Sequence, residues 1–434
     1  MEEIARAGDQ DPGAPYREKY SMKIRKTMPP AAVPISFLDL FRGIRGVFDK
    51  NVVATLENEL REYFRTEHVF LVSTGKAALF LILSGLKSLN KRKKVIIPAY
   101  TCYSVPSAII KAGLVIVPCD VRPETLDFAP EELTSLVDEE TLCVIPTHLF
   151  GIPSDIERIR EICRGKGVYI VEDAAQAMGA VHNGKQLGTL GDVAFFSLGR
   201  GKNITCGSGG IIITPSGEIA GRIRKEILKL KREPLFIYTK SMIDLFLMKI
   251  FLNPYLYWFP EGLPFLKIGE TKFYRDFSLY KFNRFKAGVL YDWRVKLESN
   301  NRFRSENGRS YIDTMNLKNT MPIYSGSFPY LRFPVYRNGP KEKEDLCNRY
   351  GYLGISPMYP DSVNNIPEIK GSFEGVKYEG AERIAKILTT LPTHVIVHEN
   401  DKEKICEAFN KNNPSVSIQI SPCLGDSIQK ENNP

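Results

Sequence analysis

The sequence predicts an α/β protein with a mainly parallel sheet that helices cover on both faces. Short continuous apolar runs, as expected for strands buried on both sides, alternate with longer helical stretches between residues 51 and 213. The chain of 434 residues has 43% hydrophobic and 25% charged residues, which is the balance of a globular protein. Its length corresponds to about two to three domains.

The large domain is assigned to residues 36–290. Its predicted strands are the apolar runs 69–72, 95–98, 114–117, 143–146, 168–171, 193–196 and 211–213. Its predicted helices span 51–64, 77–89, 104–112, 130–137 and 154–164. Parallel neighbours need long crossover connections, so this alternation indicates strands that are joined by helices.

A smaller C-terminal α/β domain is predicted after a long connecting helix. Apolar residues at steps of three or four from Phe282 to Leu297 predict that helix. A strand over 331–336 and helices over 341–350, 381–389 and 402–410 are expected to follow it. The remaining assignments are 1–35 as a disordered leader, 291–425 as the connecting helix with the small domain, and 426–434 as a polar tail. Met1 and Met22 are both candidate translation starts.

Charge and cysteine usage exclude several classes of function. The 59 basic and 50 acidic residues give a net charge of +9, and the dense basic run is confined to 91–94, so no nucleic-acid partner is expected. The eight cysteines form no CxxC pair and do not lie near histidine at zinc-ligand spacing, so no metal site is expected. Free, mostly buried thiols and a polar N-terminus predict a cytoplasmic protein.

The stretch 241–266 is strongly apolar and aromatic. Asp244 and Lys249 interrupt it, so a simple membrane span is not expected. Two interpretations stay open. One is a dimer contact or a set of core helices, and the other is a peripheral contact with a membrane surface, for which Tyr255 and Trp258 are suited.

Two segments place reactive side chains directly after predicted strands. Asp173 follows the run 168–171, at the sheet edge where α/β proteins bind ligands, although it could equally cap a helix. Lys202 follows the run 193–196 and stands after Gly201. A lysine held away from water has a lowered pKa and becomes a nucleophilic amine, whereas a surface turn would leave it inert.

A third segment, Ser73-Thr74-Gly75-Lys76-Ala77, is a turn of small residues that opens a predicted helix. Free amides at a helix start suit a phosphate, although an ordinary turn explains the pattern too. Together the three segments offer what pyridoxal 5'-phosphate (PLP) needs. The lysine forms a Schiff base, the carboxylate keeps the pyridine nitrogen protonated, and the helix start holds the phosphate.

Over about residues 36–412, the chain resembles the DegT/StrS-type aminotransferases. The matching stretches are 98–101, 113–120, 147–151, the EDAAQA block 172–177, 191–197, the KNIT block 202–205 with the glycines after it, 358–360 and 391–392. The resemblance implies a fold type I PLP enzyme and a homodimer. It also implies transfer of an amino group from an amino-acid donor, such as glutamate, to a keto or aldehyde acceptor. That acceptor would be a keto sugar or another cell-envelope precursor for polysaccharide biosynthesis.

The resemblance also implies roles for single residues. Lys202 matches the Schiff-base lysine, and Asp173 matches the partner of the pyridinium nitrogen. Gln176 matches the residue near the 3-oxygen of the cofactor, and Ser197 matches a phosphate ligand. The other implied cofactor contacts are Gly75, Lys76 and Ala77 in the phosphate loop. Cys102 or Tyr103 falls at the position where the family usually has an aromatic residue that stacks on the ring.

Two other functions stay open at this point. A PLP-dependent sugar dehydratase of the same family is one, although those relatives carry histidine in place of Lys202. A PLP-binding regulator without turnover is the other. The acceptor stays open between a keto sugar on a nucleotide and a lipid-linked or membrane-located compound.

Overall fold

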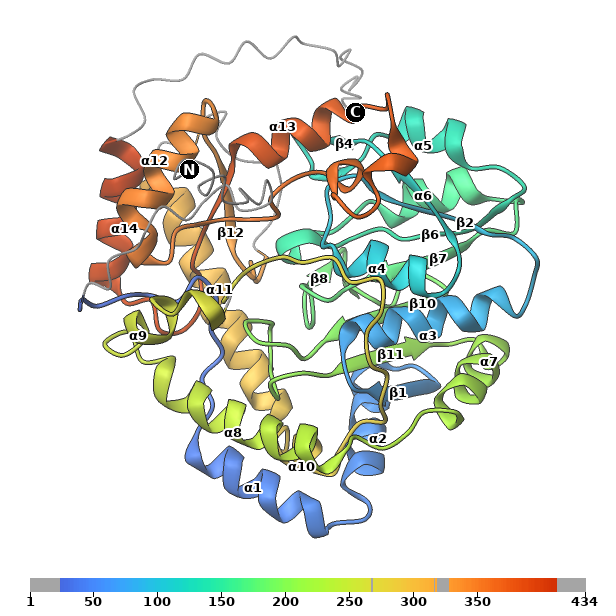
Figure 1. Ribbon diagram of the computed structural model, residues 1–434, viewed down its shortest axis with the longest axis horizontal. Helices are drawn as coiled ribbons and strands as arrows, with labels where there is room; N and C mark the ends of the chain where they lie inside the picture. Colours follow the sequence, from blue (N-terminus) through green and yellow to red (C-terminus); the bar gives the residue numbers. More distant parts are fainter. Residues whose placement is uncertain (1–23, 267, 316, 318–327, 412–434) are drawn as a thin grey trace, which may run out of the picture.

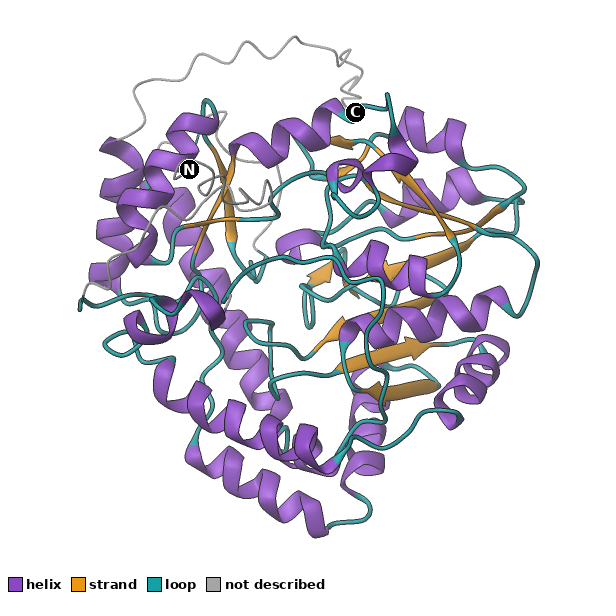
Figure 2. Cartoon of the chain, viewed as in Figure 1, coloured by secondary structure: helices purple, strands orange, loops and turns teal. Residues whose placement is uncertain are grey.

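The computed structural model describes residues 24–266, 268–315, 317 and 328–411. A large seven-stranded sheet and a small three-stranded sheet are each packed against helices (Figures 1 and 2). The predicted polar tail and residues 1–23 of the predicted leader lie outside the described residues.

The large sheet contains the strands that the apolar runs predict. They are β1 (His68–Val72), β2 (Lys94–Pro98), β3 (Val115–Cys119), β6 (Thr141–Val144), β7 (Tyr169–Asp173), β10 (Val193–Ser197) and β11 (Gly210–Thr214). Their spatial order is β1-β11-β10-β7-β6-β2-β3. Strand β11 is antiparallel to both of its neighbours, and the other pairs are parallel. The prediction of an α/β fold with a mainly parallel sheet is confirmed.

The direction of β1 decides where the site can form. Both β1 and β10 run antiparallel to β11, so β1 points the same way as β10 and β7. The carboxyl ends of these three strands therefore lie at one edge of the sheet. Ligands of α/β proteins bind at such an edge.

Helices and short strands surround this sheet. The helices are α2 (Val52–Phe64), α3 (Gly75–Lys87), α4 (Ser104–Lys111), α5 (Pro130–Leu136), α6 (Ile156–Cys163), α7 (Gly217–Leu228) and α10 (Arg284–Val289). The short elements are β4 (Val121–Arg122), β5 (Asp127–Phe128), η1 (Leu149–Gly151), β8 (Val181–His182) and β9 (Lys185–Gln186).

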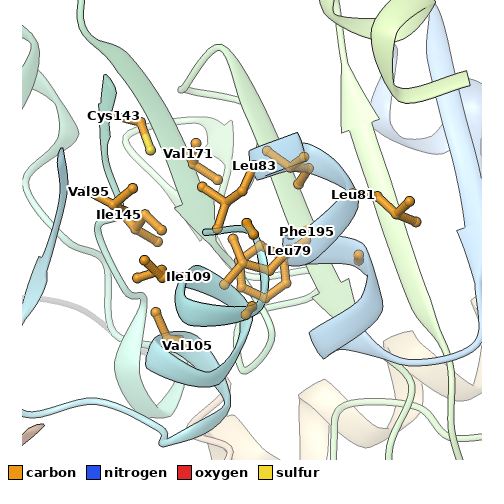
Figure 3. Packing of buried hydrophobic residues seen from close by; sticks show 14 of the residues in the cluster. Leu79, Leu81, Leu83, Val95, Val105, Ile109, Cys143, Ile145, Val171 and Phe195 are labelled. Carbon is orange, nitrogen blue, oxygen red and sulfur yellow. The ribbon is translucent and has the colours of Figure 1, made fainter. Parts of the chain in front are cut away.

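Alternate side chains of each strand pack on opposite faces of the sheet. Along β2, Val95 and Ile97 belong to the core beneath α3 and α4, whereas Ile96 packs on the other face with residues of α5 and α6. Figure 3 shows Leu79 of α3 and Ile109 of α4 close to the buried strand side chains. Burial on both faces explains why the strands are continuous apolar runs in the sequence.

The connecting helix and the small domain follow. The expected long helix is broken into α10 and α11 (Trp293–Thr314), because Leu290 and Trp293 both turn into the core beside α2. The small sheet has the order β12-β14-β13 and is antiparallel. Its elements are α12 (Pro340–Tyr350), α13 (Glu379–Ile387), α14 (Glu399–Lys411), β12 (Phe333–Tyr336), β13 (Ser356–Pro357), β14 (Leu388–Leu391), and η3 (Gly351–Leu353), η4 (Val363–Asn365) and η5 (Lys370–Phe373).

Residues 24–35, assigned to the disordered leader, are packed into the fold. Met28, Ala32, Val33 and Ile35 are buried, and Met28 lies in the core of the small domain. The prediction of a disordered leader is therefore wrong for residues 24–35. Met28 packs in the core of the small domain and Ile35 packs in the core beside α2, and no local pattern reveals these long-range contacts.

The apolar stretch 241–266 forms surface helices. It runs from α8 (Leu235–Phe251) through α9 (Trp258–Glu261) to η2 (Pro264–Leu266), beside the N-terminal helix α1 (Phe37–Phe48). No helix within the described ranges combines the length and the apolar character that a bilayer span requires.

Candidate active site

Three predicted segments meet at the edge where β1, β7 and β10 end. Asp173 is the last residue of β7, and Ser197 is the last residue of β10. The loop after β10 carries Lys202, and the turn after β1 begins α3. The parallel directions of the three strands thus bring together side chains that are far apart in the sequence.

The ammonium group of Lys202 lies inside this edge. Burial lowers the pKa of Lys202, and the charge of Arg332 lowers it further, whereas Cys102 and Asp173 act to raise it. A lowered pKa leaves more of the amine unprotonated near neutral pH, which is the form that reacts as a nucleophile or a base.

Helix α11 holds the backbone of the lysine loop. The Arg304 guanidinium is buried and donates hydrogen bonds to the carbonyl oxygens of Lys202 (3.3 Å) and Leu331 (2.7 Å). Asn300 donates to the carbonyl of Asn203 at 3.1 Å. The loop is therefore tied both to the connecting helix and to the start of the small domain.

Asp173 is buried with one strong local contact. Its Oδ1 accepts a hydrogen bond from the backbone amide of Ala175 at 3.0 Å. Burial raises the pKa of Asp173, whereas the Ala175 amide and the charges of Lys202 and His148 act to lower it. A carboxylate has room for further hydrogen bonds, so Asp173 can also accept one from a cationic N–H group in the site.

Behind Asp173 lies a buried pair that the sequence analysis did not single out. Glu172 Oε2 lies 2.8 Å from His148 Nε2, and both side chains are fully buried. His148 Nδ1 accepts from the amide of Ser154 (3.1 Å), so Nε2 carries the proton and donates it to Glu172. The backbone amides of Gly188 and Leu190 also donate to the Glu172 carboxylate, at 2.9 and 2.6 Å. This network fixes the strand that ends in Asp173.

Glu172→Gln is expected to destabilise the fold by about 3 kcal/mol at pH 7, since an amide cannot accept from all of these donors. Burial acts to raise the pKa of Glu172, but the hydrogen bonds from His148 and the glycine amides outweigh it and lower the pKa below 4.5. A lowered pKa stabilises the fold above the unfolded-state value and stops doing so as the pH falls through the folded-state value.

Urea unfolding of wild type and Glu172→Gln at several pH values checks this expectation. The difference in free energy of unfolding should be largest near pH 7 and should shrink below pH 4.5, the ordinary value for the carboxyl. Glu139→Gln, at an exposed position, is the matched control. Equal stability of wild type and Glu172→Gln at pH 7 would contradict the role of this network.

Gln176 bridges the two domains. Its Nε2 donates to the Tyr359 hydroxyl at 2.8 Å, and its Oε1 accepts from the Phe150 amide at 3.1 Å. Tyr359 also interacts electrostatically with Asp173 and Cys102, and burial raises its pKa well above 10. Gln176 therefore lies beside Asp173, and Tyr359 joins the site from the small domain.

A cradle of small groups forms at the start of α3. Thr74 caps the helix, and its Oγ1 accepts from the Ala77 amide at 3.0 Å. The amides of Gly75 and Lys76 belong to the first turn, where a helix offers no internal acceptor. A Cβ on Gly75 would lie 3.2 Å from Ser197 Oγ, so glycine lets the strand end approach the helix start closely.

The remaining predicted contacts are Lys76, Cys102 and Tyr103, and their side chains lie in different surroundings. The Lys76 ammonium lies over the rings of Tyr274 and Phe277, 4.6 and 4.7 Å from their centroids. Cys102 interacts electrostatically with Lys76 and with Lys202 and so faces the site. Tyr103 packs in the core beneath α3, and its hydroxyl donates to the carbonyl of Asp361 at 3.2 Å. Of the two candidates for the ring-stacking position, Tyr103 is held in the core, whereas Cys102 lies near the lysines of the site.

Arg332 is a second residue that sequence reasoning missed. It precedes β12, donates to Ser356 Oγ at 3.0 Å, and acts electrostatically on Lys202. Burial lowers its pKa, while Tyr359 and Tyr257 act to raise it. Within the described ranges no carboxylate pairs with this guanidinium. A partly buried cation without an acidic partner marks a place for an anionic group of a ligand.

Comparison with known proteins identifies the part of the chain that forms the site. Residues 47–232 match the sequence model of the DegT/DnrJ/EryC1/StrS aminotransferase family. The GDP-perosamine synthase of Vibrio cholerae, a curated relative, is 33% identical over 189 residues, which are 44% of this chain and 50% of that protein. The matched region thus spans about half the length of this relative.

Solved structures extend the likeness of fold to most of the chain. The Helicobacter pylori aminotransferase PseC, involved in the biosynthesis of pseudoaminic acid, covers 89% of this chain and 99% of its own, with a TM-score of 0.72 and 14% identity. A putative sugar aminotransferase from Streptococcus pneumoniae, solved in a PLP form, has a TM-score of 0.72 at 17% identity and covers 89% of this chain and 98% of its own. The predicted resemblance to this family is confirmed over residues 47–232, and these structures confirm the predicted fold.

Proposed function

We propose that the protein is a PLP-dependent aminotransferase that moves an amino group from an amino-acid donor to a keto sugar. The observation that carries this proposal is the meeting of Lys202 and Asp173 beside the start of α3, at one edge of the sheet. This is where a lysine, a carboxylate and a phosphate cradle can act on one ring.

The residues present fit PLP. The absence of a side chain on Gly75 brings the Ser197 hydroxyl close to the start of α3. A phosphate there would be held by this hydroxyl and by the amides of Gly75 and Lys76. Asp173 would hold a proton on the ring nitrogen, and Gln176 lies beside it. When bound, PLP supplies an electron sink for the carbanion that forms at the donor's Cα.

The chain's own groups provide the proton transfers. Lys202 Nζ, with its pKa lowered by burial, can accept a proton from the donor's Cα and release it again as a general acid. Arg304 and Asn300 position its loop through backbone carbonyls. The Glu172–His148 pair keeps the end of β7 rigid, so the Asp173 carboxylate stays in place.

We assign the donor's carboxylate to Arg332. The charge-assisted hydrogen bond of an arginine to a carboxylate contributes about 1.5–3 kcal/mol, so Arg332→Gln should raise the KM for the amino donor about 10- to 100-fold. The KM for the keto acceptor should change little. Steady-state kinetics with each substrate varied separately check this expectation. Arg349→Gln, an exposed site of the small domain, is the matched control. An unchanged donor KM would contradict the assignment.

The acceptor class rests on a relative, and the expected homodimer rests on the resemblance of the sequence to the family. GDP-perosamine synthase, which is similar to this chain, favours a keto sugar on a nucleotide carrier. The test is a two-stage reaction with the purified, PLP-loaded protein. Glutamate is added first, and formation of 2-oxoglutarate is measured. Keto sugars on nucleotide and lipid carriers are then added, and amination is measured by mass spectrometry.

The outcomes separate the alternatives. 2-Oxoglutarate release followed by amination of a keto sugar supports the proposal. Loss of water from a sugar without amino transfer would instead indicate a dehydratase. PLP binding without either reaction would indicate a regulator that does not turn over substrate.

A further inference from the structure

Helix α1 presents an apolar stripe to the outside. Phe37, Phe41, Ile44 and Phe48 are 63%, 56%, 46% and 81% exposed. Their spacing of four, three and four residues places them on one face of the helix. In an ordinary surface helix this apolar face would point to the core.

The stripe faces away from the core, because the buried face of α1 carries the small residues Gly43 and Gly46 together with Asp39. A Cβ on Gly43 would lie 2.7 Å from the Phe285 ring, and a Cβ on Gly46 would lie 2.8 Å from the carbonyl oxygen of Arg284. These glycines allow α1 to lie directly against α10. The Lys296–Asp39 ion pair, at 2.5 Å, fixes the helix from the side.

Helix α8 lies beside α1 and also presents an apolar face to the outside. Leu245 is its one buried residue among the 17 positions. Phe236, Ile243 and Leu247 are 70%, 58% and 42% exposed, and with Lys240 they share one face of the helix. A helix that is apolar on nearly all sides is normally buried, so this exposed face needs a cover.

The two helices form one surface with residues 255–266. Lys249 of α8 lies over the Phe37 ring of α1, 5.2 Å from its centroid. Phe251 of α8 stacks on Phe259 of α9, with centroids 5.6 Å apart. Figure 1 shows α8 running alongside α1 and leading toward α9. We call the exposed apolar side chains of α1, α8 and residues 255–266 the apolar face.

We propose that the apolar face docks on the surface of an anionic lipid bilayer. This inference is independent of the proposed reaction. The charges on the face favour lipid over a second protein. Arg45 lies at the edge of the α1 stripe and Lys240 lies within the α8 stripe, and both are exposed. Helices α1 and α8 carry the bases Arg42, Arg45, Lys240 and Lys249 against the acids Asp39 and Asp244. Arg42 pairs with Asp292, and Lys240 pairs with Asp244, which also pairs with Arg200, so the two helices keep an excess of basic groups.

Lys240 is a cation in the middle of an apolar stripe, which distinguishes the two kinds of partner. Lysine is depleted from the centres of protein–protein interfaces. At a bilayer its stem lies along apolar neighbours while the ammonium reaches the lipid phosphates. Asp39 is buried in its own ion pair, so it does not oppose the lipid. Tyr255 and Trp258 at the end of the face are residue types enriched at the headgroup level.

Co-sedimentation of the full chain with vesicles tests the proposal. Vesicles of phosphatidylcholine alone are compared with vesicles that also contain phosphatidylglycerol. The protein should pellet with the anionic vesicles. The double variant Phe41→Ser, Ile243→Ser should lower the partition coefficient about a hundredfold, since each lost side chain accounts for a factor of about ten. The variant Arg45→Glu, Lys240→Glu should weaken binding to anionic vesicles selectively.

Val115→Ser, Val376→Ser is the matched control, because these side chains are 50% and 46% exposed on other parts of the molecule. Circular dichroism confirms that each variant is folded. The proposal is overturned if wild type stays in the supernatant with anionic vesicles, or if the control loses as much binding as the test variant. It is also overturned if Phe41→Ser, Ile243→Ser turns an oligomer into a monomer in light scattering, because a second copy would then cover the face.

Discussion

Lys202→Ala is expected to lower kcat by about a thousandfold or more, because the variant lacks the amine that both bonds the cofactor and moves the proton. The protein should remain folded. The Lys202 side chain makes no ion pair within the described residues, and the loop is held through backbone carbonyls by Arg304 and Asn300. PLP should still bind the variant through the cradle of Gly75 and Ser197, with a weaker affinity.

Borohydride reduction of the PLP-loaded protein, followed by peptide mapping, checks the assignment. The pyridoxyl adduct should lie on Lys202 in wild type and should be absent from Lys202→Ala. Two other lysines serve as controls. Lys185 is exposed, and Lys76 lies against aromatic rings at the start of α3. An adduct on either of them, with Lys202 unmodified, would overturn the assignment.

The main sheet could be predicted from the sequence because each strand is buried on both faces. The run 95–98 differs by one residue from β2 (Lys94–Pro98), and 193–196 differs by one from β10 (Val193–Ser197). The antiparallel direction of β11 was not predicted, since the run 211–213 looks the same in either direction. The sequence did contain one indication of this direction. The loop from β10 to β11 carries no crossover helix, which a parallel neighbour would need.

The small domain was harder to predict. Residues 381–389 were expected to be one helix, but α13 ends at Ile387 and β14 (Leu388–Leu391) begins directly after it. The apolar spacing of the helix continues into the strand without a glycine or proline between them. β14 forms because it pairs with β12 and β13, which are distant in the sequence.

Some residues of the site could likewise be predicted from the sequence, and others could not. Asp173 and Lys202 follow strand ends closely, so the sequence alone could place them at one edge of the sheet. Arg332 could not be predicted, because its charge acts on Lys202 only when the small domain packs against the lysine loop. His148 lies in the matching stretch 147–151, but the sequence alone gave it no role. It becomes meaningful only when the fold brings it 2.8 Å from Glu172.

Asp173→Asn is expected to lower kcat about a hundredfold or more with little loss of stability. Asparagine keeps an oxygen that accepts from the Ala175 amide, so the local backbone contact survives. The negative charge is lost, and with it the means of holding a proton on the ring nitrogen of the cofactor. A weaker electron sink slows removal of the proton from the donor's Cα, whereas binding of the donor at Arg332 is unaffected. The KM for the donor should therefore stay close to that of wild type.

Asp155→Asn is the control that separates charge from capping. Asp155 caps α6 by accepting from the Arg158 amide at 2.9 Å, much as Asp173 accepts from Ala175, but it lies outside the site. If Asp173 acted only as a local cap, both variants would keep wild-type kcat and lose similar, small amounts of stability. A large fall in kcat for Asp173→Asn alone, measured in single-turnover reactions with glutamate, is the expected result. Near wild-type turnover of Asp173→Asn would show that the carboxylate at the end of β7 holds the backbone and not the cofactor.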